Sequence, residues 1–103
     1  MSESQLVYSV MRELGKHVAV YRCNCGSVRL PNGKYFRGMP KGFSDIMAIL
    51  PGGYAAFIEC KSDKGKPSPE QSAFIEKVRA LGCRAGVACS VADALAICGI
   101  EGA

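Results

Sequence analysis

Two nearly uninterrupted apolar stretches on either side of a Pro-Gly-Gly turn signal at 51–53 constrain the fold more than any other feature of the sequence. Residues 46–50 and 54–58 have the composition of strands that are buried on both faces of a sheet. A turn between two such stretches predicts an antiparallel hairpin with strands at 43–50 and 54–61. The core of the chain is therefore expected to form around a β-sheet.

Three charged residues interrupt these apolar strands, and the hairpin register places them together. If Leu50 and Tyr54 close the turn, Asp45 faces Glu59 across the two strands, and Lys61 emerges on the same face. Directly opposed carboxylates destabilise a sheet unless positive charge lies between them, so the pattern predicts a site for Mg²⁺. A bound metal and a lysine suit phosphodiester hydrolysis, because the metal polarises the phosphate and activates water.

Simpler interpretations of these three residues remain open. Asp45 could be an ordinary residue at a strand start, and Glu59 and Lys61 could face solvent. A register shift of one residue would also remove the opposition of the two acids. The apolar flanks favour the metal site, because charges in strands buried on both faces need a partner. The backbone carbonyl of Cys60 is a further candidate ligand in that site.

Helices and further strands are expected around the hairpin. Capping residues and glycine stops predict helices at 2–14, 68–81 and 90–98. Strand-like composition predicts strands at 17–25, 27–30, 34–37 and 83–89, of which the middle two flank an Asn-Gly turn and should begin the sheet. The last strand should run parallel to the strand of Glu59 through a helical crossover. The expected fold class is α/β, a mixed β-sheet flanked by α-helices in the order α-β-β-β-β-α-β-α, in one domain over 1–103.

Two polar residues on the predicted helices each carry two interpretations. Gln71 precedes apolar residues at three- and four-residue spacings and should point toward the sheet, but it also closes a capping box that begins at Ser68. Glu3 lies at the edge of the apolar stripe of the first helix, yet a glutamate in a first turn is also favoured by the helix dipole.

The charge distribution favours a polyanionic partner. The net charge is +4, and six basic residues but no acidic ones lie between Lys16 and Lys41. No apolar run approaches the roughly 20 residues that cross a bilayer, and the N-terminus lacks the features of a signal peptide. We therefore expect a soluble cytoplasmic protein without a membrane partner.

The cysteines give a weaker indication of function. Cys23 and Cys25 form a C-x-C pair, whereas structural zinc usually shows C-x-x-C or C-x-x-H spacing, and His17 is the single histidine. The six thiols are therefore interpreted as reduced and mostly buried. A thiol-based metal or redox module remains a third interpretation.

Taken together, these elements resemble the VRR-NUC domains of the PD-(D/E)xK nuclease superfamily over nearly the whole chain. The matching features are a helix opening with Glu3, a strand with Arg22 and Asn24, the segment Gly42-Phe43-Ser44-Asp45, the E-x-K element Ile58-Glu59-Cys60-Lys61, and the glycine, serine and glutamine within Gly65–Gln71. The resemblance implies a restriction-endonuclease-like fold. The family usually has proline where this chain has Ser44, a position that shapes the backbone and supplies no ligand.

The resemblance also implies residue roles. Asp45 and Glu59 would bind the metal, Lys61 would be the catalytic lysine, Gln71 would support the site, and Glu3 would complete it, often through water. The implied activity is that of a Mg²⁺-dependent endodeoxyribonuclease in which Mn²⁺ can substitute.

The resemblance finally implies a branched DNA substrate. Virus-type family members that consist of the domain alone resemble homodimeric DNases of four-way (Holliday) junctions, acting in a bacterial or virus-infected host cytoplasm. Two symmetric cuts need two active sites, so a homodimer is expected. A non-catalytic nucleic-acid-binding module with the same fold is the alternative. The expected phosphate contacts come from Arg22, Arg29, Lys34, Arg37, Lys41, Lys64 and Lys66.

Overall fold

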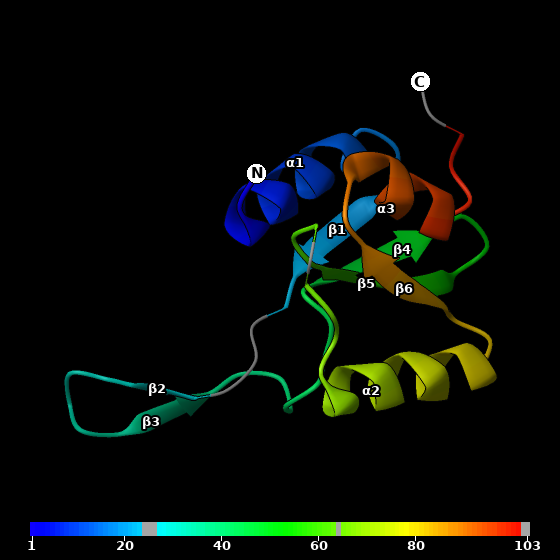
Figure 1. Cartoon of the computed structure of the whole chain (residues 1–103). Helices are drawn as coiled ribbons and strands as arrows, with labels where there is room; N and C mark the ends of the chain where they lie inside the picture. The colour runs from blue at the N-terminus through cyan, green and yellow to red at the C-terminus, as the bar shows by residue number, and fades with distance from the viewer. Residues whose placement is uncertain (24–26, 64, 102–103) are drawn as a thin grey trace.

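The computed structural model describes residues 1–23, 27–63 and 65–101 and places a four-stranded sheet between helices (Figure 1). The fold class predicted from the sequence, a mixed α/β sheet flanked by helices, is confirmed. The elements in chain order are α1 (Glu3–Leu14), β1 (Ala19–Arg22), β2 (Ser27–Arg29), β3 (Tyr35–Arg37), β4 (Ile46–Leu50), β5 (Tyr54–Cys60), α2 (Pro69–Ala80), β6 (Arg84–Ala88) and α3 (Val91–Ile97).

The main sheet has the strand order β1-β4-β5-β6, so β5 is central. It pairs antiparallel with β4 and parallel with β6, which confirms the parallel crossover through α2. Leu50 pairs with Tyr54 and Ile46 with Ile58, which is the register predicted for the hairpin. Asp45 immediately precedes β4 and is therefore carried toward Glu59.

The hairpin of β2 and β3 departs from the expected topology. It forms a two-stranded sheet of its own and projects from the layered body, whereas β1 pairs directly with β4 (Figure 1). The expectation that this hairpin begins the main sheet is therefore wrong. Five strands precede α2, in agreement with the strands predicted individually, whereas the expected order α-β-β-β-β-α-β-α has only four there. The physical reason is that β1 already occupies the free edge of β4, while β2 and β3 pair with each other.

Side-chain alternation along the strands divides the core into two clusters. One lies between the sheet and helices α1 and α3, and the other lies between the sheet and α2 (Figure 1). Ala56 and Ile58 of β5 face α1 and α3, whereas Ala55 and Phe57 face α2. Glu59 therefore projects on the α2 face. Among the described residues, no helix is long and apolar enough to span a bilayer.

Local sequence signals fix where α1 and α2 begin. Ser2 and Ser68 each cap a helix, and each makes the reciprocal capping box with the glutamine three residues later, as predicted. Pro69 occupies the first turn of α2, where its missing N–H costs no hydrogen bond. These signals place Gln71 in the first turn of α2, next to the sheet.

The loop that leads into β4 is packed tightly against the start of α2. Gly42 has φ +93°, and a Cβ at this position would meet the carbonyl oxygen of Glu70 at 2.7 Å. The ring of the next residue, Phe43, contacts Phe57 of β5 and Phe74 of α2 at centroid distances of 5.6 and 4.6 Å. The loop, the sheet and α2 thus converge two residues before Asp45.

We predict that Gly42→Ala destabilises the fold more than Gly53→Ala. Both glycines have positive φ, so both substitutions incur a backbone penalty of about 1–2 kcal/mol, but a Cβ at Gly53 meets nothing within 4 Å. Only Gly42→Ala adds a clash with backbone of α2. Urea unfolding of the two variants checks this, and equal losses of stability would contradict the close approach.

Candidate active site

Asp45 is held at the point where the pairing of β4 with β5 ends. Its Oδ2 accepts a hydrogen bond of 2.8 Å from the backbone N–H of Cys60, and its own carbonyl accepts one of 2.7 Å from Cys23 N–H. The Asp45 carboxylate thus accepts the hydrogen bond that a backbone carbonyl would accept if the pairing of β4 with β5 continued beyond Ile46, the first residue of β4. It lies beside Glu59 and is only partly buried.

Glu59 is an acidic side chain inside the sheet, with 2% of its surface exposed. Its Oε1 accepts a 2.9 Å hydrogen bond from Gln71 Nε2 and lies 3.7 Å from the Lys61 ammonium. Its Oε2 is buried and has no hydrogen-bond partner among the described residues. A buried carboxylate oxygen without a partner is costly, so this position calls for a proton or a cation.

The environment of Glu59 disfavours its charged form. Burial, reinforced by the negative charge of the neighbouring Asp45 carboxylate, raises the pKa of Glu59 to about 8. The ammonium of Lys61 acts in the opposite direction, and Glu3 adds a smaller upward effect. Asp45 and Glu59 therefore lie close enough to compete for one positive charge.

Gln71 carries out both of the roles that its sequence position suggested. Its carbonyl oxygen accepts a 2.8 Å hydrogen bond from Ser68 N–H in the capping box, while its amide nitrogen donates to Glu59. Ser68 thus orients the amide toward the carboxylate, a role that the sequence reasoning missed although the capping box was its signal. The alternatives left open for Gln71 are not exclusive.

Lys61 and Cys60 complete the end of β5. The backbone N–H of Lys61 donates 3.0 Å to Ala88 of β6, and its side chain is 16% exposed beside Glu59. Because backbone groups alternate in direction along a strand, the N–H and C=O of Cys60 point away from β6, toward Asp45. The Cys60 thiol is buried in the opposite cluster, and burial raises its pKa to about 12. The carbonyl of Cys60 thus remains the candidate ligand, whereas the thiol does not.

Glu3 and Ser44 lie around this group. Glu3 is exposed in the first turn of α1, and its charge contributes to raising the pKa of both Glu59 and Cys60. Ser44, at the position where the family usually has proline, is 1% exposed, and its hydroxyl donates to the carbonyl of Ile46 at 3.2 Å. The hydroxyl is thus satisfied internally and supplies no ligand.

The available donors fit Mg²⁺ better than zinc. Among the described residues, no group of three or more His, Cys, Asp or Glu side chains could hold a metal ion on its own. Mg²⁺ commonly binds through one or two protein carboxylates and keeps several waters, which a pair such as Asp45 and Glu59 can satisfy. Cys25 lies outside the described residues, and Cys60, Cys83, Cys89 and Cys98 form no disulfide.

The basic residues expected to contact phosphate lie on separate elements, as far as the structure describes them. Arg29 and Lys34 lie exposed on the projecting hairpin, whereas Arg22 lies at the end of β1 next to β4, and Lys66 is exposed before α2. Lys41 lies 3.6 Å from Glu70 in an exposed ion pair. Lys64, the Arg37 side chain and Asn24 lie outside what the structure describes.

Comparison with known proteins bears on the family and the fold of the chain. The family model for the VRR-NUC domain matches residues 3–92. A solved structure described as a VRR-NUC domain superimposes with a TM-score of 0.57 at 23% identity, covering 91% of both chains, which is a likeness of fold. A search of curated proteins finds no match.

We predict that the stability of the metal-free protein falls as pH rises from about 5 to about 8. The pKa of Glu59 is raised from 4.5 in the unfolded chain to about 8 when folded, so the folded state binds more protons in this window and ionisation disfavours it. The slope should reach up to about 1.4 kcal/mol per pH unit. Chemical denaturation across this range measures it.

The isosteric change Glu59→Gln is the matched control for this pH dependence. It keeps the acceptor for Gln71 and removes the titrating group, so it should flatten the profile and raise stability at pH 8. Added Mg²⁺ should stabilise the unsubstituted protein most at the alkaline end. A steep profile that survives in Glu59→Gln would contradict the assignment.

Proposed function

The chain belongs to the VRR-NUC domain family, whose members are nuclease-related, and from this premise we propose that it is a Mg²⁺-dependent, structure-selective DNA endonuclease. The proposed substrate is branched DNA such as a four-way junction, and the proposed active form is a homodimer. Mn²⁺ is proposed to substitute for Mg²⁺.

One observation carries this proposal. The carboxylate of Glu59 is 2% exposed on the central strand, its Oε2 has no partner among the described residues, and Asp45 lies directly beside it. A structural carboxylate would be satisfied by hydrogen bonds or replaced by an apolar residue. An acid pair that is unsatisfied within the protein is instead typical of a site that awaits a cation.

Each residue of the site has a chemical task in this proposal. Asp45, Glu59 and the carbonyl of Cys60 would hold the metal, which when bound supplies polarisation of the phosphate and acidification of water. Gln71 fixes the orientation of Glu59 by donating to Oε1, leaving Oε2 for the ion. The Lys61 ammonium, held near Glu59, offers positive charge to the attacking water or to the developing oxyanion. Glu3 would act from the helix, through water.

The spread of the basic residues over separate elements supports a substrate that is larger than a single DNA strand. Arg22 lies at the same end of the sheet as the proposed metal site, whereas Arg29 and Lys34 are carried outward on the hairpin of β2 and β3 (Figure 1). Contacts of this kind position a duplex through its phosphates without reading its sequence. Selectivity for branched DNA would follow from shape, and paired cuts in a symmetric junction would follow from a two-fold dimer.

The first test is cleavage of junction, flap and duplex DNA by the purified protein with Mg²⁺ or Mn²⁺. Cleavage should require the metal and should fall at least about 100-fold in Asp45→Asn, Glu59→Gln and Lys61→Met, since each removes a charge from the reacting centre. Glu76→Gln, an exposed change on α2, is the control and should cleave normally.

Two outcomes of this test would reject the proposal. Intact DNA of every shape with both metals would remove the nuclease assignment. Salt-dependent DNA binding that is indifferent to chelator and to Glu59→Gln would instead favour the non-catalytic nucleic-acid-binding module.

A second prediction concerns the hairpin of β2 and β3. Arg29→Ala and Lys34→Ala should each weaken DNA binding similarly for all sequences and reduce the slope of log K against log salt by about 1. Lys77→Ala, an exposed change on α2, should leave the slope unchanged. Fluorescence anisotropy over a salt series measures the slopes, and unchanged slopes in the two hairpin variants would remove this element from the DNA interface.

A further inference from the structure

A cavity of about 600 Å³ lies between α1 and the end of β1, on the opposite face of the sheet from the Glu59 carboxylate. Its described lining consists of Val7, Tyr8, Met11, Arg12 and Arg22. The volume falls within the range of about 300–1,000 Å³ found for small-molecule sites. The lining is mainly apolar, yet the catalytic roles proposed above use none of its α1 residues.

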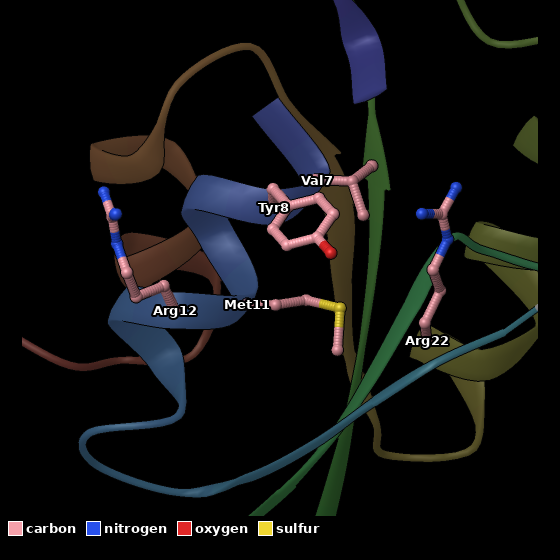
Figure 2. A pocket seen from close by; sticks show the side chains of 5 residues that line it. All are labelled: Val7, Tyr8, Met11, Arg12 and Arg22. Atoms are coloured by element: carbon pink, nitrogen blue, oxygen red, sulfur yellow. The ribbon is translucent and has the colours of Figure 1, made fainter. Parts of the chain in front are cut away.

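The lining of the cavity combines an exposed aromatic ring with two positively charged side chains. Figure 2 shows the Tyr8 ring and the Met11 thioether between the guanidinium groups of Arg12 and Arg22. Tyr8 is 76% exposed, so its ring is available to a ligand. Neither guanidinium forms an ion pair with a carboxylate in residues 1–23, 27–63 and 65–101.

The cavity and the proposed metal site lie at the same end of the sheet, on its two opposite faces. Arg22 pairs with Ile46, which follows Asp45 in the chain. Because directly opposed residues share a face, the Arg22 side chain lies on the α1 side with Ile46. On the helix, Glu3 lies one turn before Val7. A nucleic acid that holds a phosphate at the metal site and passes around this end of the sheet can thus bring a nearby nucleotide to the cavity.

We propose that this cavity binds an unpaired nucleotide of the DNA substrate, with its base on Tyr8 and Met11 and its flanking phosphates at Arg22 and Arg12. The proposal rests on the nuclease function proposed above and refines its substrate, since only DNA with an unpaired or splayed nucleotide near the cut can fill the cavity. Bases stack on aromatic side chains regardless of sequence, and guanidinium groups bind phosphate in bidentate fashion. The protein would therefore prefer DNA with a branch, whatever the base sequence around that branch.

Charge favours this occupant over a second copy of the chain. An isologous contact across this surface would bring the two guanidiniums of one protomer against those of its partner, and the described lining offers no acid to neutralise them. A phosphodiester strand supplies the negative charge that the cavity lacks, together with a planar base for its apolar part.

The experiment uses the Glu59→Gln protein, so that binding is measured without cleavage. Anisotropy compares two branched DNAs that differ only in whether the unpaired position carries a base or an abasic residue. The base should strengthen binding about 10-fold, and Tyr8→Ala should reduce this difference to about 2-fold or less, because a stacked base contributes on this scale. Tyr8→Phe should retain it. A fluorescent adenine analogue at that position should be quenched on binding in the Tyr8 protein and much less in Tyr8→Ala.

Tyr54→Ala is the matched control, since Tyr54 is 60% exposed at the far end of β5 and should leave the preference intact. Equal affinity for the base and abasic DNAs, or a preference that survives Tyr8→Ala, would overturn the proposal. A lower molar mass of Tyr8→Ala in light scattering would make the cavity a protomer interface instead. If the unsubstituted protein still cleaves branched DNA in those cases, only this inference fails. If it neither binds nor cleaves any DNA, the nuclease proposal fails with it.

Discussion

The burial of one carboxylate in the central strand is the constraint on which the rest of the site depends. Glu59 sits where β5 is flanked by strands on both sides and covered by α2, so water cannot easily solvate it. Its two oxygens are treated differently, because Oε1 is satisfied by Gln71 while Oε2 is left without a partner in the described residues. The fold therefore leaves one defined atom, Oε2 of Glu59, where a positive charge would be favourable.

The surrounding elements keep that atom in place. The capping box that starts α2 aims Gln71 at Glu59, and the end of the β4–β5 pairing brings Asp45 onto Cys60 N–H. Close approach of Gly42 to Glu70 fixes the loop before Asp45 against the same helix. The acidic pair is thus supported by rigid strands and a helix start, which is the preorganisation that a metal site requires.

The proposed contacts with the substrate lie farther from this rigid centre. The hairpin of β2 and β3 projects away from the sheet with its basic residues, and the cavity beside α1 opens on the other face (Figures 1 and 2). Phosphate contacts far from the metal site, together with a separate site for a displaced base, suit a small domain that must recognise DNA by shape. Arg22 links the cavity to the strand that leads from the metal site, because it lines the cavity and pairs with Ile46, the residue that follows Asp45.

Local patterns in the sequence determined the helix starts, the hairpin turn and the register that opposes Asp45 to Glu59, because these depend on short-range capping, turn chemistry and strand alternation. They also determined that β5 and β6 run parallel, since a helical crossover leaves little other choice. Which strand pairs with the edge of β4 was not decided locally, since β1 and the strands of the β2–β3 hairpin all have strand-like composition. That pairing depends on packing between segments far apart in the chain, so it emerged only in the folded structure. The same holds for the two hydrogen bonds of the Gln71 amide and for the absence of a partner for Glu59 Oε2 among the described residues.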